Sequence, residues 1–145
     1  MQFSTKLTSL YKYFLIDYGN DLKAVKFNFE KFCTFIAHTR EIANIFYYNA
    51  PLDITKDREK YKLQQKFFDK LSRIPKFNLV LCKMIKRKIK GTNEFYYVLK
   101  EDDIRMAGDM IKGAFKNFYD TAILVSGDGD FVPAVKIVRE EEKEV

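Results

Sequence analysis

The sequence has no tryptophan, a single histidine, only two cysteines and, among 145 residues, just six glycines and three prolines. Zinc hydrolases and enzymes with a Ser–His or Cys–His nucleophile rely on histidine, so a lone His38 argues against these classes. We interpret His38 as a residue on a helix surface, with a role as a base or ligand as the alternative. Cys33 and Cys82 match neither a zinc pair nor a disulfide framework, and we expect two free thiols.

The sequence also lacks an apolar run of about 18 residues and a signal-peptide pattern, so we expect a soluble, intracellular, cytoplasmic protein without a membrane partner. With 47% hydrophobic and 32% charged residues, the composition is that of a globular protein. No repeat or linker divides the chain, which predicts one domain over residues 1–145. The net charge of +6 is compatible with a polyanionic partner but is weak support on its own.

What the sequence does contain is an alternation of strand and helix patterns. Strands are predicted at Tyr13–Ile16, Ile42–Tyr48, Leu79–Ile89 and Thr121–Val125, and helices at Asp21–Thr39, Lys56–Arg73, Asp102–Phe118 and from Phe131 onward. A turn at Lys90–Asn93 is predicted to return the chain as a hairpin arm at Phe95–Leu99. This alternation predicts an α/β protein with a three-layer, doubly wound, mainly parallel sheet of strand order 3-2-1-4.

Acidic side chains follow the first and the last of these predicted strands. Asp17 and Asn20 come after the first strand, and "SGDGD" supplies Ser126, Asp128 and Asp130 after the last. Sites in doubly wound sheets form at the carboxyl ends of strands, so these residues are expected to converge if the two strands are neighbours. A structural alternative is that Asp130 only caps the following helix.

A third group of acids opens the helix predicted at Asp102–Phe118. Asp102 and Asp109 are seven residues apart and lie nearly on one helical face, while Asp103 is about 100° away from Asp102 around the axis. An acid in a first turn also complements the helix dipole, which is a sufficient structural reason for either Asp102 or Asp103.

Three stretches closely resemble the NYN domain, in particular its LabA-like branch within the PIN-like nuclease superfamily. They are "FLIDYGN" (14–20), "LKEDDIRMAGDM" (99–110) and "AILVSGDGDFVPAV" (122–135), in the order that the family shows. The residues that match the family pattern are Asp17, Asn20, Lys100, Asp103, Asp109, Met110, Ser126, Gly127, Asp128, Asp130 and Phe131.

The resemblance implies a metal-dependent ribonuclease, a hydrolase of RNA phosphodiester bonds that uses Mg²⁺ or Mn²⁺. We expect Asp17, Asp103 and Asp128 as the principal metal ligands and catalytic residues, with Asp130 completing the ring. Asn20 and Ser126 are expected to contact substrate, and Asp102 and Asp109 to support the ligands. A catalytically inactive RNA-binding or regulatory module of the same fold is the alternative. A different phosphate enzyme is disfavoured, because "GxxxxGKS" and "GxGxxG" are both absent.

The chain departs from the family pattern in three places. Asp102 stands where the family often has an apolar residue, so a metal ligand shared between Asp102 and Asp103 stays open. The segment 81–99 is longer than the usual connection. The fifth strand and following helix of the fold are not present before Val145, so we expect a C-terminally truncated domain with an uncovered sheet edge.

The long connection is strongly basic, with Lys83, Lys86, Arg87, Lys88 and Lys90 in eight positions. We expect Lys83, Lys86, Arg87 and Lys88 to contact RNA phosphates. The alternative is a solvated hairpin whose charges discourage edge pairing. Tyr96 and Tyr97 are candidates for base stacking or for ordinary packing. A homodimer stays open as an assembly.

Overall fold

The computed structural model describes residues 3–7 and 28–145. Its elements are β1 (Phe3–Leu7), α2 (Phe29–Ala37), β2 (Ile42–Asn49), α3 (Arg58–Ser72), β3 (Phe77–Leu81), β4 (Lys83–Lys88), β5 (Phe95–Lys100), α4 (Asp102–Phe115), β6 (Ala122–Val125), the 3₁₀ turn η1 (Gly129–Phe131) and α5 (Val132–Glu140). Four strands form a parallel sheet in the order β3-β2-β1-β6, and β4 and β5 form a separate antiparallel hairpin. The structure is thus the mixed α/β type that the alternation predicted.

The first strand of the sheet is not the one that we expected. Phe3–Leu7 lies between β2 and β6, in the position predicted for Tyr13–Ile16. Phe3, Thr5 and Leu7 alternate with smaller or charged residues, which is a strand pattern, but the prediction favoured the continuous apolar run. The segment Tyr13–Ile16, and the part of the predicted helix before residue 28, lie outside the described residues.

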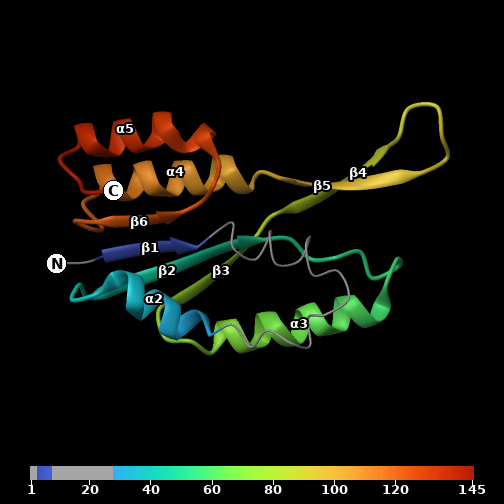
Figure 1. Cartoon of the computed structure of the whole chain (residues 1–145), viewed down its shortest axis with the longest axis horizontal. Helices are drawn as coiled ribbons and strands as arrows, with labels where there is room; N and C mark the ends of the chain where they lie inside the picture. Colours follow the sequence, from blue (N-terminus) through green and yellow to red (C-terminus); the bar gives the residue numbers. More distant parts are fainter. Residues whose placement is uncertain (1–2, 8–27) are drawn as a thin grey trace.

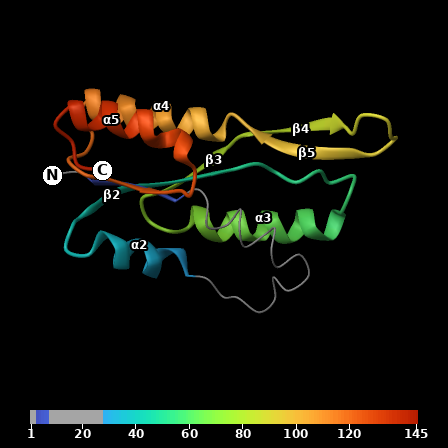
Figure 2. The ribbon, with the colours of Figure 1, turned by 45° about the horizontal axis from the view of Figure 1, so that its top comes forward.

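Helices cover both faces of the sheet. Figures 1 and 2 both show α2 and α3 on one face and α4 and α5 on the other. Side chains of β2 alternate accordingly, because Ile45 and Tyr47 belong to the cluster with α2 and α3, whereas Tyr48 packs with Met106 of α4. Burial on both faces explains why β2 reads as a nearly continuous apolar run in the sequence.

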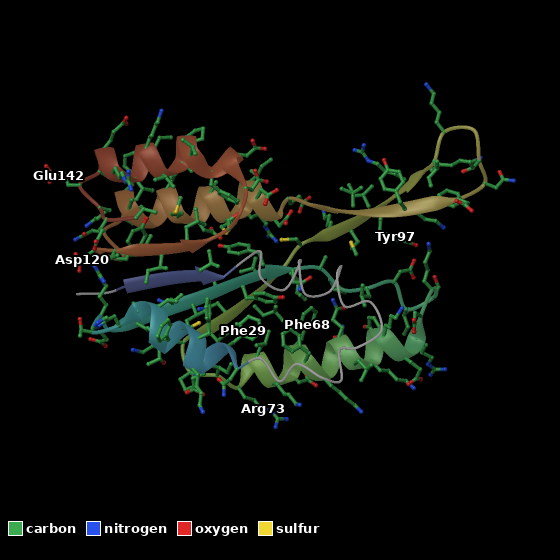
Figure 3. The ribbon with its side chains drawn as sticks, viewed as in Figure 1. Phe29, Phe68, Arg73, Tyr97, Asp120 and Glu142 are labelled. Atoms are coloured by element: carbon green, nitrogen blue, oxygen red, sulfur yellow. The ribbon has the colours of Figure 1, made fainter. Side chains whose placement is uncertain are left out.

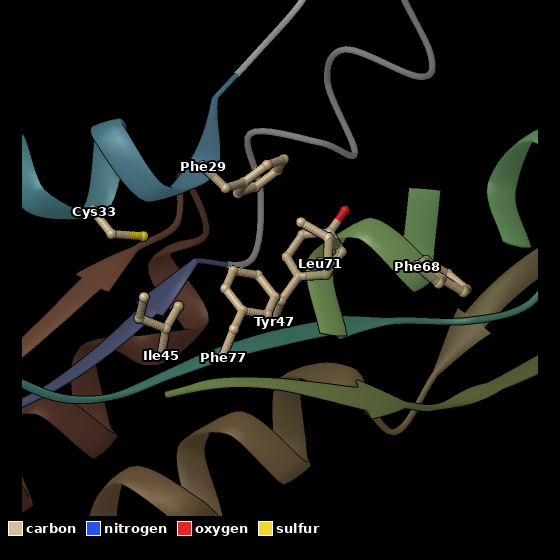
Figure 4. Close-up of a cluster of buried hydrophobic side chains, with 7 residues drawn as sticks. All are labelled: Phe29, Cys33, Ile45, Tyr47, Phe68, Leu71 and Phe77. Carbon is tan, nitrogen blue, oxygen red and sulfur yellow. The ribbon is translucent and has the colours of Figure 1, made fainter. Parts of the chain in front are cut away.

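Aromatic side chains dominate the core under α2 and α3 (Figure 4). The ring centroid of Phe29 lies 5.4 Å from that of Tyr47 and 6.1 Å from that of Phe77, both in edge-to-face geometry. Such pairs contribute about 0.5–1.5 kcal/mol each beyond the burial of their area. Cys33, beside them, is fully buried, and burial raises the pKa of its thiol to about 12. Both cysteines are free, as expected.

Local hydrogen bonds set the ends of α2 and α3. Asn28 Oδ1 accepts from the Lys31 amide and Asp57 Oδ1 from the Lys60 amide, each at 2.9 Å, so both helices begin with a side-chain cap. Buried Gln64 joins α3 to the segment after β2, since its side chain accepts from Leu52 N at 2.7 Å and donates to Ala50 O at 2.9 Å.

The strand predicted at Leu79–Ile89 is in fact two strands that belong to different sheets. β3 pairs with β2 and ends at Leu81; the Cys82 amide then donates to Asn49 O at 2.7 Å, and Lys83 begins β4. The predicted turn at Lys90–Asn93 and the returning arm are confirmed, because β5 pairs antiparallel with β4. Helix α4 ends at Phe115, earlier than predicted, with the left-handed Asn117 (φ 54°) just beyond it.

The chain returns to the sheet edge at its C-terminal end. Glu144 forms one parallel bridge with Thr121, and its carbonyl accepts from the Ala122 amide at 2.8 Å. The Arg40 guanidinium lies 3.0 Å from the Glu144 carboxylate. Among the described residues no helix has the length and apolarity needed to span a membrane.

Candidate active site

The carboxyl ends of the parallel strands and the start of α4 lie at the same edge of the sheet (Figure 1). β6 ends there at Val125, and α4 begins there at Asp102, directly after the hairpin. One buried cluster joins these parts, since Met106 of α4 packs with Phe131 of η1 and with Tyr48 of β2. The fold therefore brings the acids of the two described segments, 102–109 and 126–130, to the same edge.

The two acids that open α4 differ in exposure. Asp102 is buried and Asp103 is exposed, although both stand in the first turn, where a negative charge complements the helix dipole. Asp102 lies near the buried thiol of Cys82, whose pKa is raised by burial first and further by this carboxylate, while Arg105 lowers it. The sequence favoured Asp103 as the metal ligand, and Asp102 is the one that the structure turns inward.

Asp109, two turns further along α4, is held by a tyrosine of the sheet. The Tyr48 hydroxyl donates to Asp109 Oδ2 at 2.6 Å, and only 2% of Tyr48 is exposed. Burial, followed by the hydrogen bond to Asp109, raises the pKa of Tyr48, so the hydroxyl keeps its proton at neutral pH and stays a donor. Tyr48 was not among the predicted site residues. It lies at the end of a predicted strand, which is the kind of position where other candidate residues were found.

Asp128 organises the turn after β6. Its Oδ1 accepts from the Asp130 amide at 2.9 Å, and the Asp128 amide donates to Ser126 Oγ at 3.1 Å. Asp128 is thus the residue that caps η1, and the alternative that Asp130 caps the last helix is wrong: α5 begins at Val132 without a side-chain cap. Both carboxylates are exposed.

Arg105 adds a positive charge to this edge that the sequence analysis also missed. Its Nη1 donates to Leu81 O at 2.8 Å, which joins α4 to the end of β3. The only sequence signal for a role of Arg105 was its position about one turn into the predicted helix, three residues after Asp102.

The chemistry of these donors suits a hard divalent cation, because Mg²⁺ prefers carboxylate oxygens. Within residues 3–7 and 28–145, however, no three His, Cys, Asp or Glu side chains form a group that could hold a metal ion. Asp103, Asp128 and Asp130 therefore do not make a metal site by themselves. The predicted site also needs Asp17, which lies outside the described residues together with Asn20, so it stays a prediction.

The basic hairpin projects from the same edge and extends well beyond the sheet (Figures 1 and 2). Its base is tied to the start of α4, because Lys83 Nζ lies 3.4 Å from the Glu101 carboxylate. Lys86 Nζ lies 4.3 Å from the ring centroid of Phe95. Arg87 and Lys88 are exposed. The hairpin thus presents positive charge next to the acidic edge.

A comparison with protein families finds that the NYN domain model matches residues 13–145. The match begins at Tyr13, so it includes "FLIDYGN" and leaves out Phe3–Leu7. Neither the curated proteins nor the solved structures that were compared contain a match to the chain.

Proposed function

Because the chain belongs to the NYN domain family, we propose that it is a metal-dependent ribonuclease of the LabA-like branch, with a PIN-like three-layer fold. The observation that carries the proposal is the family match over 13–145, since it includes all three acidic motifs. The common edge shared by 102–109 and 126–130 supports it.

In this proposal the acidic residues have different roles. Asp17, Asp103, Asp128 and Asp130 would hold Mg²⁺ or Mn²⁺ directly or through water. When bound, such an ion lowers the pKa of a coordinated water and stabilises the leaving oxygen of a phosphodiester. Asp109 is held in place by the Tyr48 hydroxyl, and Ser126 accepts from the Asp128 amide, so both act by positioning. Asn20 and Ser126 would contact the substrate phosphate.

RNA reaches an acidic edge only if cations offset the repulsion between its phosphates and the carboxylates. The hairpin supplies them, because six basic residues and one acid lie between Lys83 and Lys100. This charge supports a polyanion-binding surface beside the proposed catalytic edge.

Cleavage of a labelled single-stranded RNA by the full chain tests the proposal. We expect products with Mn²⁺ or Mg²⁺, none with EDTA, and none from Asp128→Asn. Asp69→Asn is the matched control, because Asp69 is an exposed acid on α3, away from this edge. This variant should cleave RNA like the wild type. Cleavage that persists in EDTA and in Asp128→Asn would refute a metal-dependent site.

A second measurement does not depend on turnover. Binding of Mn²⁺ to the folded state raises the melting temperature, and this shift should shrink in Asp128→Asn but not in Asp69→Asn. An RNA-binding module without turnover is the second candidate, favoured by the basic hairpin beside this edge. RNA binding with no products and no Mn²⁺ shift would select it.

A further inference from the structure

The two faces of the β4–β5 hairpin differ in what already covers them. Directly opposed residues of an antiparallel pair share a face. The register sets Ile85 opposite Val98 and Arg87 opposite Tyr96, and these four residues form the outer face. The neighbouring positions, with Lys86 opposite Tyr97 and Lys88 opposite Phe95, form the inner face.

The aromatic rings of the inner face are engaged within the protein. Tyr97 Oη donates to Asp53 Oδ2 at 2.5 Å, and Lys56 Nζ lies 4.5 Å from the Tyr97 ring centroid. Figure 3 shows Tyr97 at the part of the hairpin next to the main body. The Phe95 ring carries Lys86 Nζ over its face. The contacts of Tyr97 anchor the hairpin to the segment after β2, and Phe95, which is 42% exposed, has the Lys86 ammonium over one face of its ring.

The outer face also carries exposed side chains. Tyr96 is 46% exposed and Ile85 42% exposed, and the side chain of Lys83, next on this face, is 76% exposed. Among the described residues the side chain of Arg87, directly opposite Tyr96, forms no hydrogen bond or ion pair. A guanidinium beside an uncovered aromatic ring combines a phosphate ligand with a stacking platform.

Charge and ring chemistry together select the occupant. The hairpin's net positive charge favours a polyanion, and stacking on Tyr96 requires a base that is not paired within a duplex. We propose that the outer face binds single-stranded RNA, with a base stacked on Tyr96 and phosphates held by Arg87 and Lys83. The choice of RNA over other nucleic acids depends on the proposed function. Of the predicted contacts, Lys86 is then assigned to covering the Phe95 ring and not to the RNA.

The hairpin offers matched pairs of variants for the test. Arg87→Gln and Lys86→Gln remove the same charge from adjacent positions on opposite faces, and Tyr96→Leu and Phe95→Leu remove adjacent rings likewise. Affinity for a fluorescent oligouridine is measured by anisotropy in EDTA, where no metal-dependent cleavage occurs. Circular dichroism melts show that each variant is folded.

We expect Arg87→Gln and Tyr96→Leu each to weaken binding by about five-fold or more, in line with the loss of one stacked base or one phosphate contact. Lys86→Gln and Phe95→Leu should weaken RNA binding by about two-fold at most. Lys86→Gln removes only a charge that acts on the RNA at long range, and Phe95→Leu removes no charge. Arg87→Gln should also reduce the slope of log affinity against log salt by about 0.7. A duplex RNA should bind without dependence on Tyr96.

Equal losses in both members of each pair would overturn the assignment of faces, and so would unchanged affinity in Tyr96→Leu. The failure of this inference is distinct from that of the proposed function. Metal-dependent cleavage with no outer-face effect overturns only the RNA surface, whereas outer-face binding without any cleavage overturns only the nuclease.

Discussion

At the scale of single residues, the hydrogen bond between Tyr48 and Asp109 is the best-defined polar contact of the candidate site. Tyr48 is on the side of β2 that faces α4, and burial raises the pKa of its hydroxyl further above neutral pH. This hydrogen bond favours one orientation of the Asp109 carboxylate, although the residue itself is exposed. Such a contact suits a positioning role for Asp109.

Two glycines of α4 respond differently to an added methyl group. A Cβ at Gly113 would lie 2.6 Å from Cε1 of Tyr119, whose ring is buried and whose hydroxyl donates to Met110 O at 2.6 Å. A Cβ at Gly108 would meet nothing within 4 Å. We expect Gly113→Ala to lower the free energy of unfolding by about 1–3 kcal/mol through overpacking. Gly108→Ala should raise it by up to about 1 kcal/mol through helix propensity.

Urea denaturation of both variants measures these changes, since the midpoint reports stability when the slope is unchanged. Gly108→Ala is the control for the effect of alanine in this helix. A Gly113→Ala variant as stable as Gly108→Ala would show that the Tyr119 ring moves aside without cost.

Residue identity alone predicted the acids of this edge but not their partners. Ser126 and Asp128 stand out in the sequence because they follow an apolar run, and Asp103 and Asp109 because they are acids at the start of a predicted helix. That Asp128 caps η1 depends on the path of the turn, and that Tyr48 meets Asp109 depends on the packing of α4 against β2. Neither contact has a local sequence signal, because each joins atoms that only the folded backbone brings together.

At the scale of elements, the junction between the hairpin and α4 carries backbone strain. Glu101 precedes α4 with φ 73° and ψ −14°, in the left-handed region, and makes no side-chain cap. This conformation costs a residue with a Cβ about 1–2 kcal/mol, whereas glycine adopts it freely. The exposed ion pair with Lys83 contributes little, so Glu101→Gly should raise the free energy of unfolding by about 0.5–1 kcal/mol.

Glu101→Ala is the control for this prediction, because it removes the same carboxylate but keeps the Cβ. Its stability should stay within about 0.5 kcal/mol of the wild type in the same urea experiment. If Glu101→Gly is no more stable than Glu101→Ala, the left-handed conformation at this junction is not a source of strain.

The hairpin also shows where sequence patterns stop predicting elements. Residues 79–89 read as one strand because apolar side chains recur through the whole segment. The chain changes partners at Cys82, from β2 to β5, and pairing partners leave no mark on local periodicity. The turn at Lys90–Asn93 was predictable because glycine and asparagine favour turns by their own backbone preferences.

At the scale of the whole molecule, the proposed site depends on which segment of the chain forms the central strand of the sheet. Phe3–Leu7 pairs there with both β2 and β6. The family match begins at Tyr13 and so does not include Phe3–Leu7. A strand between two neighbours and under helices on both faces favours continuous apolar sequence, which "YFLI" offers and "FSTKL" does not. Asp17 directly follows "YFLI", so our prediction of the acidic site requires this segment at the centre.

A pair of equivalent substitutions distinguishes the two segments. If Tyr13–Ile16 serves as a central strand of the native sheet, Leu15→Asp introduces an unpaired buried charge and should destabilise the protein by several kcal/mol. Leu7→Asp should then cost less, and a chain that starts at Thr8 should still unfold cooperatively in urea. The reverse ranking, with Leu7→Asp the more damaging, would make Phe3–Leu7 indispensable. In that case Asp17 has no strand to bring it beside Asp128, and the four-acid metal site loses its structural basis.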